Sequence, residues 1–346
     1  MKGRPRHRYE RFVRPILFRL DPEKAHDLAI GWLRRASTTP LLLRLLQRFR
    51  PEDQPRTVFG IRFPNPIGLA AGFDKNGVAL PALAALGFGF VEIGTVTARA
   101  QPGNPTPRMF RYSDREALIN RLGFNNDGAD VVANRLRQLR ESGGWPNIPV
   151  GINIGKSKIT PIEEAMADYL HSFRRLRPYA DYVVLNVSSP NTPGLRSLQS
   201  TAALSELLRG VQDENRSSKP IVVKIAPDLA SSDLEAIATT CEAHGVAAII
   251  ATNTTLDHSA IPRERDEAGG LSGSPLREKS TVLIRQLAAA TKIPIIGCGG
   301  IMGGISAREK IEAGASLLQI YTGFIYRGPG LLREIAAAIG DKTLSS

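Results

Sequence analysis

One short segment concentrates side chains that can take part in chemistry. It reads Leu185-Asn-Val-Ser-Ser-Pro-Asn-Thr-Pro-Gly-Leu-Arg196 and directly follows the apolar run Tyr182-Val-Val-Leu185. Its hydroxyl and carboxamide groups are uncharged and can both donate and accept hydrogen bonds. Such groups suit a flat heterocycle with alternating C=O and N–H groups. Because Pro, Asn and Ser also form ordinary turns, the segment gains meaning only from the rest of the chain.

Polar residues follow other short apolar runs of the chain in the same way. Lys75 and Asp74 come after the first run, Thr95 and Thr97 after the second, and Thr252 to Thr255 after the sixth, while Asn153 stands at the end of the third and Lys224 lies within the fifth. The two lysines could form ion pairs at a rim, for instance Lys75 with Asp74. Alternatively, one could compensate a flavin ring that becomes anionic on reduction and the other a substrate carboxylate.

Glycines follow the seventh and eighth runs. Gly297-Cys-Gly-Gly300 and Tyr321-Thr-Gly323 leave backbone N–H groups accessible at the points where helices are expected to begin. Such positions bind phosphate in many α/β barrels. The pattern therefore predicts a phosphorylated cofactor, such as a flavin nucleotide.

The sequence does not favour glycosidase, metal-dependent or histidine-based catalysis. No Asp/Glu pair stands at the ends of the runs, which argues against glycosidase chemistry. No His, Cys or Asp cluster has metal-ligand spacing, so we expect no metal. Of the histidines, only His258 lies near the end of a run, and a histidine base is therefore not favoured.

The apolar runs predict the elements that must position these groups. Most are continuous rather than alternating, as in parallel strands covered on both faces. Eight runs separated by helical patterns within about 290 residues favour an α/β fold, a (β/α)8 TIM barrel. An open doubly wound sheet is the alternative, but no GxGxxG follows the first run. The gap at residues 98–148 is too long for one crossover and should carry an insertion. The eight runs are residues 66–70, 90–94, 150–154, 182–185, 221–225, 248–251, 293–297 and 317–320.

Composition places the positive charge at one end of the chain. Thirteen Lys and Arg against four acidic residues give the first 50 of the 346 residues a net charge of +9, out of +12 for the whole chain. The two cysteines, Cys241 and Cys298, cannot form a disulfide framework, which favours a reducing, cytoplasmic setting. No stretch reaches the roughly 18 apolar residues of a transmembrane helix, and no signal peptide is expected.

Residues 1–50 predict a small helical extension of the barrel, which would occupy residues 51–346. Asp21-Pro-Glu23 has the N-cap, proline and first-turn acid of a helix start. The next segment, Leu41-Leu-Leu-Arg-Leu-Leu-Gln-Arg-Phe49, is too apolar for a short solvated helix. Leucines beside arginines favour an in-plane anchor at a membrane surface. A hairpin packed only on the barrel and a nucleic-acid arm are the less favoured alternatives.

The motifs together resemble a known family. The chain is similar to the class 2, membrane-associated, quinone-dependent dihydroorotate dehydrogenases, whose motifs occur in family order along nearly its whole length. The matching segments are 68–75, 92–97, 120–126, 151–155, 186–196, 223–228, 251–255, 269–273 and 319–323.

The resemblance implies specific roles. Ser189 would be the catalytic base, taking a proton from C5 while hydride leaves C6 for the flavin, and His26 and Arg111 would lie near the quinone head. FMN would contact Ala71, Gly72, Phe73, Asp74, Lys75, Thr95, Asn153, Asn186, Lys224, Thr252, Gly273, Gly300, Tyr321 and Thr322. Dihydroorotate would contact Lys75, Asn120, Arg121, Leu122, Gly123, Phe124, Asn186, Asn191, Asn253 and Thr254.

The activity implied by the resemblance is oxidation of (S)-dihydroorotate to orotate in de novo pyrimidine (UMP) biosynthesis. The final acceptor would be a membrane quinone, either ubiquinone or menaquinone. We expect a monomer without a nucleic-acid partner, bound peripherally to the cytoplasmic side of the cell membrane. Another FMN barrel reductase is the nearest alternative, and a non-enzymatic basic binding protein would explain residues 1–50 only.

Overall fold

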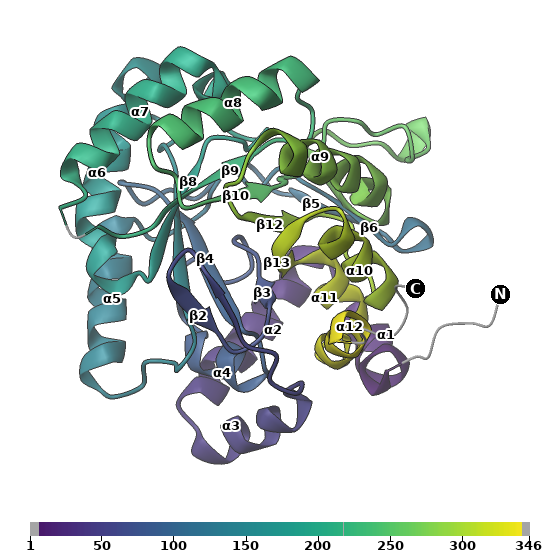
Figure 1. The fold of residues 1–346 in the computed structure, drawn as a ribbon. Coiled ribbons are helices and arrows are strands. Elements are labelled where there is room, and N and C mark those ends of the chain that lie inside the picture. The colour runs from purple at the N-terminus through teal and green to yellow at the C-terminus, as the bar shows by residue number, and fades with distance from the viewer. Residues whose placement is uncertain (1–6, 217, 341–346) are drawn as a thin grey trace.

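The computed structural model describes residues 7–216 and 218–340. Within them, eight parallel strands close into a barrel in the order β10-β12-β13-β3-β4-β7-β8-β9 (Figure 1). The predicted (β/α)8 barrel is therefore confirmed, and each predicted strand lies within two residues of an observed one. The barrel strands are β3 (Ile67–Leu69), β4 (Phe90–Val96), β7 (Val150–Ile154), β8 (Tyr182–Asn186), β9 (Ile221–Ile225), β10 (Ala248–Ala251), β12 (Ile295–Cys298) and β13 (Ala315–Ile320).

Helices cover the outside of the barrel and explain why its strands are continuously apolar. Every residue of β4, β7, β8, β9, β10 and β12 is buried, because one face of each strand packs on helices and the other fills the barrel. The outer helices are α4 (Leu80–Ala85), α5 (Ala129–Glu141), α6 (Ala165–Leu176), α7 (Thr201–Glu214), α8 (Ser231–Ala243), α9 (Arg277–Ala290), α10 (Gly304–Glu312), α11 (Thr322–Arg327) and α12 (Gly330–Gly340).

A hairpin not expected from the sequence closes the N-terminal end of the barrel. Strands β1 (Arg56–Val58) and β2 (Ile61–Phe63) pair antiparallel outside the barrel sheet. The Phe63 ring is fully buried and meets the Phe90 ring edge to face, with 5.2 Å between centroids. Because this end is closed by side chains, the opposite end of the strands is left to hold a ligand.

The predicted insertion at residues 98–148 contributes a second sheet. Strands β5 (Met109–Tyr112) and β6 (Ala117–Asn120) form an antiparallel hairpin, and β11 (Gly270–Gly273) pairs with β6 from the β10–α9 connection. Two segments about 150 residues apart in sequence are thereby joined beside the C-terminal ends of the barrel strands. The sheet supplies one wall of the site described below.

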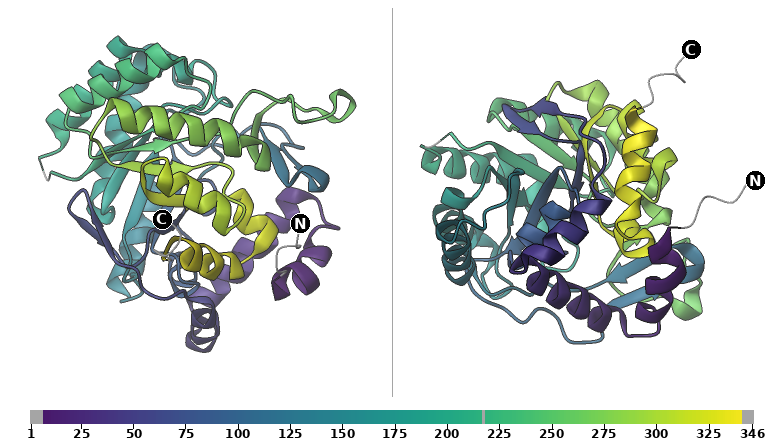
Figure 2. Two further views of the ribbon diagram at one scale, coloured as in Figure 1. Left: turned by 45° about the vertical axis from the view of Figure 1, so that its right-hand side comes forward. Right: turned by 90° about the horizontal axis from the view of Figure 1, so that it is seen from below.

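The N-terminal helices lie together on one side of the barrel (Figure 2). They are α1 (Arg14–Leu17), which follows a π-helical turn at Tyr9–Val13, α2 (Pro22–Ser37) and α3 (Pro40–Leu46). The predicted helix start is confirmed, since Asp21 Oδ1 accepts hydrogen bonds from the backbone N–H groups of Glu23 and Lys24. Leu33, Ala36 and Leu46 are buried against the barrel core, so one face of this extension packs on the barrel.

Candidate active site

An open cavity lies at the C-terminal ends of the barrel strands, with about 140 Å³ available to a ligand once open solvent is left out. Most residues predicted to bind ligands line it, although they come from seven of the eight barrel strands, or the loops after them, and from the inserted sheet. Those that line the cavity are Ala71, Gly72, Lys75, Thr95, Asn120, Leu122, Gly123, Phe124, Asn186, Ser189, Asn191, Lys224, Thr252, Asn253, Thr254, Gly273, Gly300, Tyr321 and Thr322.

A chain of buried amides and hydroxyls forms the floor of this cavity. The Thr95 hydroxyl donates to Asn153 Oδ1 at 2.6 Å, and Asn186 Nδ2 donates to both Thr95 Oγ1 (2.8 Å) and Asn153 Oδ1 (3.2 Å). Asn153 itself is fully buried beneath the lining residues. Each group is thereby held in one orientation, and Thr95 and Asn186 line the cavity above Asn153.

A carboxylate that the sequence analysis overlooked lies below these amides. Glu92 of β4 is fully buried and accepts hydrogen bonds from Asn153 Nδ2 and Gln319 Nε2. Burial raises the pKa of Glu92, while the positive charge of Lys224 opposes the shift. Gln319 Oε1 is buried without a partner among the described residues, and Gln319 lines the cavity. A lone acid within an apolar strand, Phe90-Val-Glu-Ile93, was the signal that could have found it.

Loops after β8 and β10 meet over the other half of the cavity. Asn253 Nδ2 donates to Ser188 Oγ at 3.0 Å, which joins the two loops directly. Asn191 Nδ2 donates to the Asn120 carbonyl oxygen (3.0 Å), which joins the β8 loop to the inserted sheet. Ser189 is 5% exposed and lines the cavity, and its Oγ accepts a hydrogen bond from the Asn191 backbone N–H.

Lys75 brings positive charge to the cavity near the N-terminal helices. Burial lowers its pKa to about 8, against the opposing effects of Glu23 and Asp27 on α2. Glu23 is held in turn by a two-pronged ion pair with Arg108, whose shortest distance is 2.6 Å. A lysine whose charge is disfavoured by burial gains stability from an anionic ligand.

At the ends of β12 and β13, glycines allow a ligand to come close to the backbone. Gly300 has a φ of +71°, and a Cβ there would lie 2.2 Å from the Arg277 Cα. The Thr322 hydroxyl beside it pairs with Ser272 Oγ at 2.9 Å. Only glycine fits at position 300, which leaves the backbone open to a ligand at this wall.

Three predicted ligand residues direct their side chains elsewhere. The Asp74 carboxylate accepts from the backbone N–H groups of Val78 and Ala79 and so holds its own loop. Phe73 packs edge to face on His26, with 5.2 Å between centroids. Arg121 forms an ion pair with Glu267 at 2.9 Å. Any ligand contact by these residues would therefore come from the backbone.

The two residues predicted near a quinone lie at the junction with the N-terminal helices. His26 Nδ1 is buried without a hydrogen-bond partner in the described structure, and burial lowers the pKa of the ring. Arg111 donates to the carbonyl oxygens of Phe18 and Leu20 and stacks on the Phe18 ring at 4.1 Å. Both are held by the extension rather than by the barrel floor.

Two predicted absences concern metals and disulfides. Among the described residues, no group of three or more His, Cys, Asp and Glu side chains is arranged to hold a metal ion. Cys241 and Cys298 are both free and buried. Cys298 lines the cavity, whereas Cys241 lies on α8 outside it.

A closed parallel barrel with a polar cavity at its strand C-termini is the architecture of a (β/α)8-barrel enzyme. The sequence profile described as dihydroorotate dehydrogenase matches residues 55–342. The chain is 52% identical over 342 residues to the dihydroorotate dehydrogenase (quinone) of Methylococcus capsulatus, covering 96% of this chain and 98% of the relative. It is 50% identical to that of Klebsiella pneumoniae, covering 96% and 100%.

Solved structures agree with these sequence relatives. The crystal structure of DHODH in complex with ferulenol from Eimeria tenella superposes with a TM-score of 0.83 at 35% identity, covering 94% of this chain and 93% of that one. The chain therefore belongs to the dihydroorotate dehydrogenase family, whose members are flavin-dependent.

Proposed function

We propose that the protein oxidises dihydroorotate to orotate, with FMN as the bound flavin and a membrane quinone as the final acceptor. The observation that carries the proposal is the cavity itself. It gathers a buried amide floor, a glycine-lined wall, two lysines and Ser189 at one end of a barrel. The reaction serves de novo synthesis of pyrimidine nucleotides.

The residues present fit a flavin nucleotide. Lys224 is 6% exposed, lines the cavity and forms no hydrogen bond with the described residues, so its charge is available to a ring that becomes anionic. The unpartnered Gln319 Oε1 and the Asn186 amide offer further polar contacts beneath it. The glycine wall at Gly300, with the Thr322 hydroxyl, suits a phosphate. When bound, the flavin takes up the hydride lost by the substrate and passes two electrons to the quinone.

The substrate residues follow from the other half of the cavity. Asn120, Asn191 and Asn253 offer amides to the C=O and N–H groups of a pyrimidine ring. They are held by bonds to one another and to Ser188, so little reorganisation is needed on binding. Lys75 would hold the substrate carboxylate, whose negative charge favours the protonated ammonium.

Ser189 would remove the proton from C5 of the substrate. A serine hydroxyl is a weak base and acts only if its own proton can leave. The Asn191 backbone N–H donates to one lone pair of Ser189 Oγ, which leaves the second lone pair to take the C5 proton while the hydroxyl hydrogen is passed on. Neighbouring hydroxyls and a water molecule would relay that proton to solvent.

Electrons would pass from the flavin to the quinone on the side of the N-terminal helices. We propose that residues 1–50 form a domain that binds the membrane and admits the quinone. The unpartnered His26 Nδ1 and the Arg111 guanidinium would meet the quinone head there. Nine of the fourteen exposed large apolar side chains of the described structure belong to this segment. They are Phe12, Val13, Ile16, Leu20, Leu28, Trp32, Leu41, Leu45 and Phe49.

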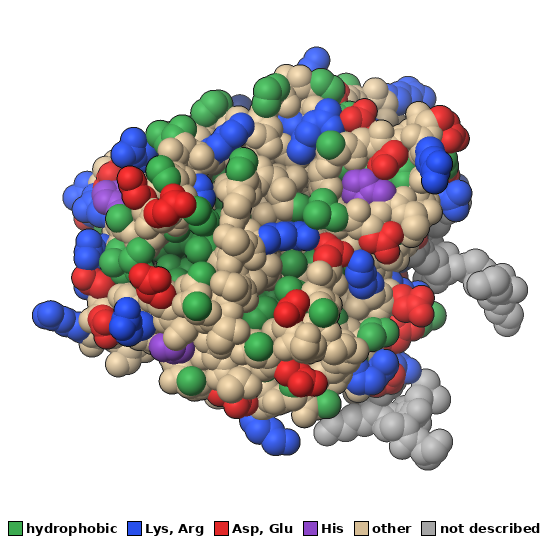
Figure 3. Space-filling model, turned by 90° about the horizontal axis from the view of Figure 1, so that it is seen from above, with side chains coloured by type: hydrophobic (Ala, Val, Ile, Leu, Met, Phe, Trp, Pro, Cys, Tyr) green, Lys and Arg blue, Asp and Glu red, His purple; other side chains and the backbone are tan. Residues whose placement is uncertain are grey.

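This concentration supports peripheral binding to a membrane surface, and we propose that the protein binds on the cytoplasmic side as a monomer. Exposed apolar side chains beside arginines bind an anionic bilayer surface without crossing it. Within the described residues, no helix combines the length and apolar character needed to span a bilayer. The face in Figure 3 carries Lys and Arg side chains interspersed with Asp and Glu, with apolar side chains among them.

The deciding experiment is anaerobic flavin bleaching. Dihydroorotate is added to the purified protein, the flavin absorbance is followed, and a short-chain ubiquinone is then added. Bleaching followed by recovery is the expected result, since it requires both half-reactions. A yellow protein that stays oxidised would refute the substrate, and a colourless protein that takes up no added FMN would refute the cofactor.

A further inference from the structure

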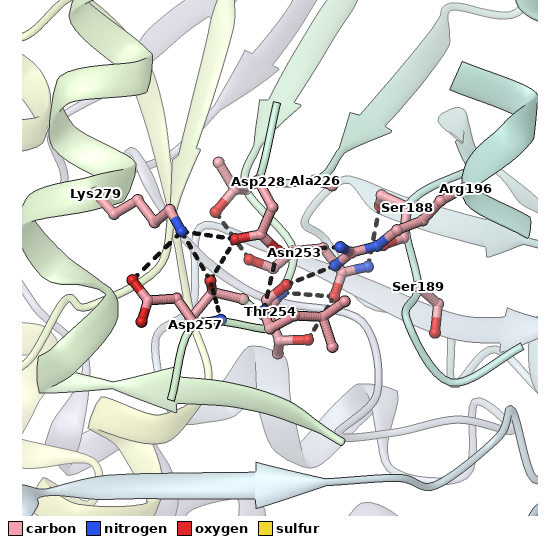
Figure 4. A network of polar contacts seen from close by, with 12 residues as sticks. Ser188, Ser189, Arg196, Ala226, Asp228, Asn253, Thr254, Asp257 and Lys279 are labelled. Atoms are coloured by element: carbon pink, nitrogen blue, oxygen red, sulfur yellow. Dashed lines mark hydrogen bonds and ion pairs between the residues drawn. The ribbon is translucent and has the colours of Figure 1, made fainter. Parts of the chain in front are cut away.

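Arg196 joins three loops behind the cavity. Its Nε donates to the Ser188 carbonyl oxygen at 3.0 Å, its Nη2 to the Thr254 carbonyl oxygen at 3.1 Å, and its Nη1 to Asp228 Oδ2 at 3.0 Å. Ser188, Asp228 and Thr254 follow β8, β9 and β10, which are adjacent in the barrel. Figure 4 shows the guanidinium between the Ser188 loop and Thr254, with Asp228 on the far side.

The contact with Ser188 also closes the loop between residues 188 and 196. Arg196 lies in the 3₁₀ helix Leu195–Gln199 and reaches back to the start of the same loop. Ser189 and Asn191 therefore lie on a segment tied at both ends. The Thr254 contact then fixes that segment against the loop that carries Asn253.

Asp228 keeps the guanidinium oriented. Its other oxygen accepts from Lys279 Nζ at 2.7 Å and from the Thr255 hydroxyl, and its Oδ2 also accepts from the Leu256 backbone N–H. Burial raises the pKa of Asp228, but the bonds from Lys279, Thr255 and Arg196 outweigh it and the pKa falls below its ordinary value. The carboxylate is therefore charged when it holds Arg196.

We propose that Arg196 is a positioning residue for the reductive half-reaction. Its planar fork sets the distance between the Ser189 loop and the Asn253–Thr254 loop, and so places the base relative to the substrate amides. A lysine cannot replace it, because a single ammonium does not present three donors in fixed directions. The inference rests on the proposed oxidation of dihydroorotate.

The variant Arg196→Lys tests this positioning while keeping the charge. At saturating dihydroorotate, flavin reduction should slow roughly 100-fold, the loss typical of a reacting group displaced by about 1 Å. Flavin content and reoxidation by a short-chain ubiquinone should stay within about twofold of the parent protein. A matched control is Arg174→Lys, since Arg174 forms a two-pronged pair with Glu214 on the barrel exterior; it should leave all three values unchanged.

An isotope effect separates positioning from a general loss of structure. With substrate deuterated at C5, Arg196→Lys should show a larger ratio of protio to deuterio reduction rates than the parent protein, because proton removal becomes slower. Parent-like reduction, or a rate loss matched by flavin loss with an unchanged isotope ratio, would overturn the proposal.

A second variant keeps the test decisive if Arg196→Lys does not fold. Asp228→Asn preserves shape, and its reduction rate should fall roughly tenfold with the same rise in isotope ratio; parent-like values would overturn the proposal. Failure of the parent protein to bleach at all would instead refute the proposed function, so the two failures are distinguishable.

Discussion

The barrel mouth and the N-terminal helices differ in which kind of side chain they bury and which they expose. At the mouth, polar side chains are buried and nearly every one has a fixed partner, as in the Thr95, Asn153 and Asn186 chain. In the extension, apolar side chains are exposed, with Leu41 at 68% and Ile16 at 64%. Polar side chains are usually exposed and apolar ones usually buried, so each region departs from the usual pattern in the opposite way.

The difference indicates two kinds of ligand. Buried polar groups held by fixed partners present their remaining hydrogen-bonding sites in set directions, which suits a small heterocycle. Exposed apolar groups gain free energy only when a surface removes them from water. Substrate chemistry and electron delivery are therefore expected to fail independently, and each prediction below tests that separation.

The largest effect is expected for Ser189→Ala. Removing a general base costs about 10²- to 10⁴-fold in rate, so reduction of the flavin by dihydroorotate should fall by that range. Quinone reoxidation of chemically reduced protein should be unchanged. Anaerobic stopped-flow measures both steps, with Ser197→Ala as a control on the same segment. Reduction at the parent rate would exclude Ser189 as the base.

The extension can be altered without touching the mouth by changing Ile16, Trp32 and Leu41 together to serine. Removal of the exposed side chains should weaken binding to anionic vesicles roughly 100-fold, since each contributes about 1 kcal/mol on partial burial. The reductive step should be unaffected. Vesicle sedimentation and stopped-flow give the two values, with Ile305→Ser, an exposed site on α10, as control. Vesicle binding at the parent level would contradict the surface role.

Substitution is preferable to removal of residues 1–50. Leu33 and Leu46 are buried in the main core, so truncation would expose barrel side chains as well. A loss of quinone turnover in a truncated chain could then come from damage to the barrel. The serine variants keep these buried contacts and therefore separate the two regions.

Lys75 links the two regions and predicts a pH dependence. Its pKa of about 8 is set mainly by burial, opposed by Glu23 and Asp27 of α2. Below that pH the ammonium is charged and can hold the substrate carboxylate, whereas above it affinity for orotate should fall by up to about tenfold per pH unit. Orotate titrations followed by flavin absorbance measure this. Lys75→Met should remove the step near pH 8, and a flat profile in the parent protein would refute the assignment.

The smallest effect is expected at the start of α2. Asp21 caps the helix by accepting from two backbone N–H groups, so Asp21→Ala should lower the free energy of unfolding by about 1 kcal/mol. Denaturant titration checks this, and Asp21→Asn is the control because asparagine caps equally well. Reduction of the flavin should be unchanged in both variants. An alanine variant as stable as the parent would show that the cap contributes nothing.

Much of the site was accessible from the sequence because strand ends in a parallel barrel share one rim. Residues as distant as Thr95 and Thr252 therefore line one cavity, as their places after apolar runs predict. Glu92 was missed because it lies inside a strand rather than after it. Arg121 was predicted to bind the substrate because it lies in the segment 120–126, but its side chain forms an ion pair with Glu267.

The sequence by itself determined the eight strands, the rim residues and the segregation of charge and leucine into residues 1–50, because these depend on local periodicity and composition. Only the tertiary structure decided that the β1–β2 hairpin closes one end of the barrel and that β6 pairs with β11. It also decided that Arg196 donates hydrogen bonds to Ser188, Thr254 and Asp228. Those contacts join segments far apart in the chain. Their partners are chosen by packing and hydrogen-bond satisfaction in three dimensions, for which no local pattern exists.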